Sequence, residues 1–219
     1  MTRSLPLVAG VAALAAAWSG LPAMMFGHGF SAHMTAHLTV VCVAAPLIAL
    51  ALAGARLDPV RVAPVLFAAI PASLFELAVV WGWHAPALHD AARQASAMLV
   101  LEQASFLLAG LVLWLSVLSG PGGDGVAARN RTAAGVIALL LTSMHMTLLG
   151  TLLALAPRPL YGESHGLAAG VGLADQQLGG TLMLIVGGAT YLAGGLALAA
   201  RLLRAEPERV HAAAKAGAP

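Results

Sequence analysis

Long apolar stretches that are almost free of charge dominate this chain and restrict what it can fold into. A helix needs about 20 such residues to cross the hydrocarbon core of a bilayer. Six stretches approach or exceed that length, near residues 5–21, 32–53, 62–83, 97–118, 132–156 and 177–203. The pattern predicts an all-α fold, a polytopic bundle of six transmembrane helices in a lipid bilayer.

The charge content favours the same fold class and excludes others. Lys and Arg total 11 and Asp and Glu total 9 in 219 residues, which makes the chain 9% charged, against about 25% in a soluble domain. This composition excludes a soluble globular enzyme, a disordered chain and a nucleic-acid-binding module with a basic face. We expect a single helical domain over residues 1–204 and a polar, flexible, cytoplasmic tail over 205–219.

Basic residues indicate which way the bundle faces. If both termini are cytoplasmic, the outer loops contain only Arg93 and Arg158, as the positive-inside rule requires. The inner basic residues are then Arg3, Arg56, Arg61, Arg129, Arg131, Arg201, Arg204, Arg209 and Lys215. We therefore expect cytoplasmic N- and C-termini. The first span has an alternative interpretation as a cleaved signal peptide, because Arg3 precedes an apolar run that ends near small residues.

Histidine and methionine are frequent in this chain, with eight of each, whereas Cys42 is the single cysteine and excludes a disulfide framework. In the expected topology, seven histidines lie toward the outer side of the membrane: His28, His33, His37, His84, His89, His145 and His165. We interpret His28, His89 and His165 as solvated residues of the outer loops.

Two motifs among these residues favour a metal site. His33 and His37 are one helical turn apart, and two imidazoles on one face can chelate an ion; helix capping or a hydrogen-bonded polar corner is the alternative. Met144-His145-Met146 lies deep in the fifth expected span, where an imidazole needs a partner or a function; a structural histidine is the alternative. Imidazole and thioether donors suit Cu(I). The candidate ligands are His33, His37, His84, His145, Met34, Met144 and Met146.

Three acidic residues are candidates for supporting such a site. Glu76 and Glu102 lie within expected spans, where a carboxylate must face the bundle interior. Glu76 is a candidate for orienting a ligating imidazole, with a protonated hydrogen bond between helices as the alternative. Asp175 precedes the last expected span and should cap its N-terminus.

Six short motifs follow one another in a characteristic order. They are His33-Met34-Thr35-Ala36-His37-Leu38, Trp83-His84-Ala85-Pro86-Ala87-Leu88, Leu101-Glu102-Gln103-Ala104-Ser105-Phe106, Met144-His145-Met146, Pro159-Leu160-Tyr161 and Asp175-Gln176-Gln177-Leu178-Gly179-Gly180-Thr181-Leu182-Met183. In sequence and spacing these motifs resemble the bacterial CtaG family, the membrane-embedded assembly factors of caa(3)-type cytochrome c oxidase.

The resemblance implies a helical, multi-pass protein of the bacterial cytoplasmic membrane that is needed to mature a haem–copper oxidase. It implies an oxidase subunit within the membrane as the partner. The motif residues carried over by position are His33, His37, His84, His145 and Asp175. Many members of the family have a histidine where this chain has Gln103, so the site here is altered or has fewer ligands if that histidine binds the metal.

These observations together lead to the hypothesis of a copper-binding assembly factor that is not an enzyme. Copper, with Cu(I) favoured, is captured outside the membrane by Met24, Met25 and His28, and then passes to the candidate ligands in the outer half of the membrane and on to the oxidase. Three alternatives stay open: a haem-binding electron carrier, a proton or solute pathway through the buried acids and His145, and a metal-free assembly scaffold.

Overall fold

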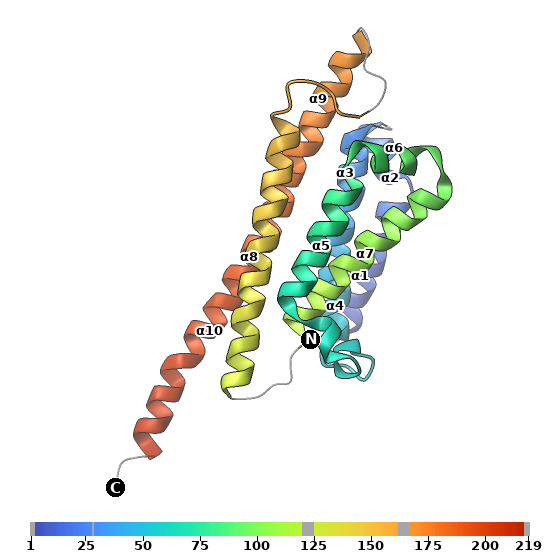
Figure 1. Ribbon diagram of the computed structural model, residues 1–219. Helices are drawn as coiled ribbons and strands as arrows, with labels where there is room; N and C mark the ends of the chain where they lie inside the picture. The colour runs from blue at the N-terminus through green and yellow to red at the C-terminus, as the bar shows by residue number, and fades with distance from the viewer. Residues whose placement is uncertain (1–2, 28, 120–124, 162–166, 217–219) are drawn as a thin grey trace.

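The computed structural model describes residues 3–27, 29–119, 125–161 and 167–216, and every regular element in these ranges is helical (Figure 1). The α-helices are α1 (Ser4–Trp18), α2 (Leu21–Phe26), α3 (Phe30–Leu38), α4 (Ala45–Leu52), α5 (Ala69–Trp83), α6 (Pro86–Gln94), α7 (Ser96–Leu118), α8 (Val126–Ala154), α9 (Leu167–Leu182) and α10 (Gly188–Ala216). Two π-helical segments, Thr39–Ala44 and Met183–Gly187, join α3 to α4 and α9 to α10. The all-α prediction is confirmed for the described residues.

Four helical stretches in the described part of the chain are long and apolar enough to cross a membrane. They are Phe30–Leu52, Ser96–Leu118, Val126–Ala154 and Gly172–Arg204. Helices α1 and α5 are also apolar but have 15 residues each, which cover about 22 Å at 1.5 Å per residue. A multi-pass helical membrane protein is therefore supported, whereas the count of six spans and the cytoplasmic position of both termini stay predictions.

The third and the sixth expected spans differ most from the helices of the structure. The segments Pro59–Arg61 and Pro64–Phe67 are short 3₁₀ turns, and α5 begins only at Ala69. Proline has no backbone N–H and is favoured at the first position of a helix, so each proline starts a new turn here. The last helix begins well before residue 177, and its backbone stays helical through 205–216. The flexibility expected of the tail stays a prediction.

Helix α8 packs against α5, α9 and α10, while α3 packs against α9 and α1 against α4. The α8–α9 contact depends on glycine. A Cβ on Gly150 would lie 2.5 Å from the backbone nitrogen of Leu184, and a Cβ on Gly180 would lie 2.5 Å from that of Ala154. Small residues of this kind let two membrane helices approach backbone to backbone.

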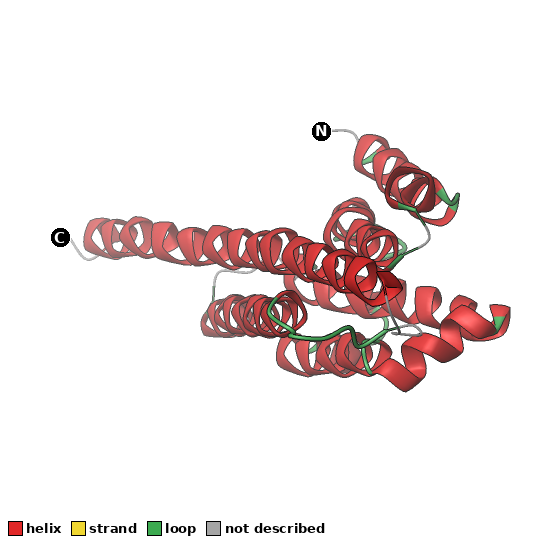
Figure 2. Ribbon diagram, turned by 90° about the horizontal axis from the view of Figure 1, so that it is seen from above, coloured by secondary structure: helices red, strands yellow, loops and turns green. Residues whose placement is uncertain are grey.

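The start of α1 and the end of α10 lie at one end of the bundle, and the segments that bear His33, His84 and His89 lie at the other. In Figure 1, α1 begins and α10 ends at the lower end, whereas the short helices α2 and α6 lie at the upper end. Seen from above, α10 extends beyond the other helices (Figure 2). The start of α3 and the end of α5 reach the same upper end as α6, and these three elements form the site described next.

Candidate metal centre

Four buried histidines meet where α3, α5 and α6 come together. His33 and His37 lie in α3, His84 directly follows α5, and His89 lies in α6. The ring centroid of His33 is 4.9 Å from that of His89 and 5.4 Å from that of His84. The ring centroid of His37 is 5.3 Å from that of His84. All four residues are at most 5% exposed, and we call them the imidazole cluster.

Helix geometry and one backbone contact orient three of these rings. The rings of His33 and His37 are 8° from parallel with centroids 6.3 Å apart, as their spacing in α3 predicts. The Nδ1 atom of His84 lies 2.6 Å from the carbonyl oxygen of Val80. Because a carbonyl only accepts, Nδ1 carries the hydrogen and the lone pair is on Nε2. This is the usual support of an imidazole that binds a metal through its other nitrogen.

Six nitrogen atoms of the cluster have no hydrogen-bond partner among the described residues: both of His33, both of His37, Nε2 of His84 and Nδ1 of His89. Buried polar groups are rarely left in this state, and each unmade hydrogen bond costs about 1–3 kcal/mol. Burial, with the neighbouring Arg93 guanidinium, lowers the pKa of His89 to about 3. This imidazole is therefore neutral at pH 7, which is the form that binds metals.

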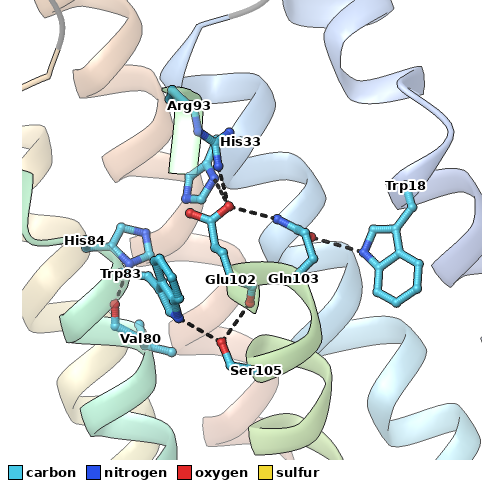
Figure 3. A network of polar contacts seen from close by, with 9 residues as sticks. All are labelled: Trp18, His33, Val80, Trp83, His84, Arg93, Glu102, Gln103 and Ser105. Carbon is cyan, nitrogen blue, oxygen red and sulfur yellow. Dashed lines mark hydrogen bonds and ion pairs between the residues drawn. The ribbon is translucent and has the colours of Figure 1, made fainter. Parts of the chain in front are cut away.

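The carboxylate of Glu102 in α7 points toward His33 (Figure 3). Its Oε2 accepts from the Arg93 guanidinium and from the Gln103 amide nitrogen, which is 3.2 Å away. The Nδ1 atom of His33 lies 3.8 Å from the same oxygen. The indole nitrogen of Trp18 donates to the Gln103 side-chain oxygen at 3.1 Å. Gln103 therefore holds the carboxylate in place and links α1 to the site.

The atoms best placed to share an ion belong to His33, His89 and Glu102. One ligand atom from each lies within 4.8 Å of the other two. Ligands bonded to a single ion at about 2 Å are roughly 3–3.5 Å apart, so small side-chain rotations bring this set into bonding range. His37 and His84 adjoin it as further donors.

This arrangement corrects the interpretation of His89 as a solvated loop residue. His89 and Ala92 are the buried residues of α6, and they lie three positions apart on one face of that helix. The sequence signal was the change after Trp83 from an uninterrupted apolar stretch to an amphipathic one. Such a pattern predicts a short helix with one buried face, lying across the end of the bundle.

Two cavities reach the cluster, and His33 and Arg93 line both of them. The smaller, of about 490 Å³, also has polar residues of α6 and α9 in its wall, including Asp90 and Gln176. The larger, of about 780 Å³, is lined mostly by apolar residues of α1, α2, α3 and α7. The site is therefore approached from a polar side and from an apolar side.

Four of the seven candidate ligands lie apart from the cluster. His145 is buried in α8, and the described ring contacts of the cluster do not include it. Met34 packs against Gly179 of α9, and Met146 packs against the second π-helical segment. Met144 is 59% exposed on the outside of α8 and faces away from the bundle, whereas Met146 is fully buried.

Glu76 contacts α10 instead of the imidazole cluster. The hydroxyl of Tyr191 donates to its Oε1 at 2.5 Å. The indole nitrogen of Trp114 donates at 3.0 Å to the carbonyl oxygen of Val41, which lies in the first π-helical segment. The structure does not place Glu76 as the partner of a ligating imidazole, since its hydrogen bond is with Tyr191 and a backbone carbonyl orients the ring of His84. A hydrogen bond between helices, the alternative, is present.

Asp175 holds the start of α3. Its carboxylate accepts from the backbone nitrogens of Phe30 and Ser31 and from the Ser31 hydroxyl. The first N–H groups of a helix have no partner within the helix, and a negative charge there is favourable. Because α9 begins at Leu167, Asp175 lies inside that helix and does not cap it as expected. It fixes instead the end of α3 from which His33 projects.

The expected copper-capture residues are described only in part. Met24 and Met25 are exposed on α2, whereas His28 lies outside the described residues, as does His165.

No curated protein and no solved structure matches this chain significantly. The family model described as cytochrome c oxidase caa3 assembly factor matches residues 1–205. The match covers the imidazole cluster, Glu102 and Asp175, and it confirms the resemblance carried by the motifs. The chain therefore belongs to the family of cytochrome c oxidase caa3 assembly factors.

Proposed function

We propose that this protein binds copper, as Cu(I), on the imidazole cluster and delivers it to a subunit of cytochrome c oxidase within the membrane. Membership of the family of cytochrome c oxidase caa3 assembly factors supports cytochrome c oxidase as the enzyme that receives the copper. The observation that carries the copper assignment is the set of six buried imidazole nitrogens without a hydrogen-bond partner in the described chain. Each neutral imidazole has one nitrogen with a lone pair, so a bound cation would give up to four of these nitrogens a partner that the described part of the chain does not supply.

The donor set favours a borderline or soft metal. Calcium and magnesium prefer oxygen ligands, whereas neutral imidazole suits copper and zinc. The single carboxylate of Glu102 would balance the charge of one Cu(I) ion. Copper is cargo in this proposal, so the site must release it as well as hold it. Access from two cavities supports such an exchange.

The cluster would lie near the outer face of the bacterial cytoplasmic membrane. The basic residues of the chain favour a cytoplasmic location for both termini. The cluster is at the end of the bundle opposite to the start of α1 and the end of α10 (Figure 1). Transfer would then occur to the outer half of an oxidase subunit, and the protein would act as a carrier without catalysis.

Metal analysis of the purified protein tests the proposal. Protein in detergent is incubated anaerobically with Cu(I), desalted and analysed for copper. We expect the wild type to retain copper and the double variant His33→Ala/His37→Ala to lose it. His145→Ala is the matched control, because His145 is a buried imidazole outside the cluster, and it should retain copper as the wild type does.

Three results would contradict the proposal in distinguishable ways. Equal copper in the wild type and the double variant would remove this pair from the site. An absorption band of haem in the purified protein would favour an electron carrier. Full oxidase maturation in cells that carry only a variant lacking the four cluster histidines would favour a metal-free scaffold.

A further inference from the structure

A permanent cation lies beside the candidate metal site. The Arg93 guanidinium pairs with Oε2 of Glu102, and His33 Nδ1 lies 3.8 Å from that oxygen. A positive charge at this position repels an incoming metal ion, and it occupies an oxygen of the only carboxylate among the best-placed ligand atoms. The proposed function alone does not explain why a metal carrier would place an arginine there.

The two partners of this ion pair differ in their freedom to move. The side chain of Glu102 is fully buried, whereas that of Arg93 is 37% exposed. Glu102 is also held by the Gln103 amide, which the indole of Trp18 supports in turn (Figure 3). The carboxylate is therefore fixed on α7, and the guanidinium is the partner that can withdraw.

The surroundings of Arg93 give it space to withdraw. It lines both the polar cavity of about 490 Å³ and the apolar cavity of about 780 Å³. In the polar cavity, Asp90 and Asp175 are further acidic residues of the wall. A long, flexible side chain at this position can leave Glu102 and remain solvated.

The ion pair also neutralises the charge of the buried Glu102 carboxylate. A buried, ionised carboxylate without a partner is strongly unfavourable, so a positive charge beside Glu102 stabilises its ionised form whether or not a metal is bound. One Cu(I) ion and one guanidinium carry the same charge, and exchanging them leaves the site balanced.

We propose that Arg93 is the resident counter-ion of Glu102, which Cu(I) displaces on binding and which returns as Cu(I) leaves. The inference rests on the proposed function, because it concerns the same site. Arg93 is in this view a positioning residue that weakens copper binding enough for transfer. It holds the carboxylate ready in the empty site, and it competes with the ion in the loaded site.

Variants of Arg93 test this inference through copper affinity. Competition with a chelator gives the affinity for Cu(I), and transfer to excess chelator gives the release rate. Removing the guanidinium that competes with Cu(I) for the Glu102 carboxylate should make Arg93→Gln bind Cu(I) about tenfold more tightly, and release it correspondingly more slowly. Arg93→Lys keeps the charge and should stay close to the wild type. Arg158→Gln, at an exposed arginine that lines neither cavity, is the matched control and should change neither quantity.

If Arg93 had only a structural role, Arg93→Gln should bind Cu(I) less tightly than the wild type, because losing a structural ion pair weakens the site. The variant Arg93→Gln/Glu102→Gln keeps the test valid if Arg93→Gln alone folds poorly, since it buries no unpaired charge. In the Glu102→Gln background Arg93 has no carboxylate to pair with and can withdraw into the cavities that it lines, so adding Arg93→Gln should tighten binding much less than in the wild-type background. Tightening of the same size there would overturn the inference, as would unchanged or weaker binding by Arg93→Gln in the wild-type background. Absence of copper binding by the wild type would instead refute the proposed function, and the inference with it.

Discussion

Gly29 lies against the carboxylate of Asp175. The substitution Gly29→Ala should therefore destabilise the wild type but stabilise a variant that lacks this carboxylate. Gly29 directly precedes α3, with φ −87° and ψ −171°, an extended conformation that alanine adopts readily. A Cβ at this position would nevertheless lie 2.2 Å from Oδ2 of Asp175. Gly29→Ala therefore pushes the carboxylate away from the donors at the start of α3.

The size of the effect follows from the hydrogen bonds that are lost. The carboxylate accepts from the backbone nitrogens of Phe30 and Ser31 and from the Ser31 hydroxyl. Hydrogen bonds to charged groups contribute about 1.5–3 kcal/mol each but do not add fully, so Gly29→Ala should lower the free energy of unfolding by about 2–4 kcal/mol. In the Asp175→Ala background the obstacle is gone, and the same substitution should stabilise by about 0.4–1 kcal/mol because alanine restricts the unfolded chain.

Reversible unfolding in mixed micelles of detergent and SDS, followed by circular dichroism, gives the four free energies that the comparison needs. Gly82→Ala is the matched control, since a Cβ there meets nothing within 4 Å among the described residues. It should be neutral or stabilising in both backgrounds. If Gly29→Ala costs the same with and without the Asp175 carboxylate, the reasoning is refuted.

Three further substitutions test other contacts. Gly180→Ala places a Cβ 2.5 Å from the backbone of α8, so it should reduce stability by about 1–3 kcal/mol, as measured by thermal unfolding. Tyr191→Phe removes the hydroxyl that donates to Glu76 and should cost about 1–3 kcal/mol, while metal analysis finds the copper content unchanged. Met144→Leu alters an exposed side chain and should leave both the unfolding temperature and the copper content unchanged; a loss of copper would return this thioether to the site.

Apolar length and helical periodicity predict the long elements of the fold well. The expected spans at 32–53 and 97–118 correspond to Phe30–Leu52 and Ser96–Leu118. The helical repeat also predicts the shared face of His33 and His37. Residues 167–174 contain no charge and no proline, so apolar length alone does not locate the helix start, and α9 begins before residue 177. Because α9 begins earlier than expected, Asp175 lies inside this helix and does not cap it. Its carboxylate caps α3 instead.

The rotation of a helix about its axis is harder to predict in a membrane protein. Lipid and protein core are both apolar, so hydrophobic residues cover every side of such a helix and give no amphipathic signal. Met144 and Met146 are both next to His145 in sequence, yet one is exposed and the other fully buried. Glu76 is likewise paired with Tyr191, 115 positions away in the chain. No local pattern specifies a contact of that kind.

A comparison of His145 with His33 distinguishes two explanations for a buried imidazole without a hydrogen-bond partner. Both of its nitrogens lack hydrogen bonds within the described chain, as do those of His33, but only His33 has other imidazoles and a carboxylate beside it. If these rings only fill space, leucine at either position removes an unmet hydrogen bond and stabilises the protein by about 1–3 kcal/mol. If the cluster is retained for its cargo, His33→Leu gains that stability and loses copper, because residues kept for function are often not those that are best for stability. His145→Leu should then gain stability with its copper content intact, so unfolding and metal analysis of the same two variants distinguish the two explanations.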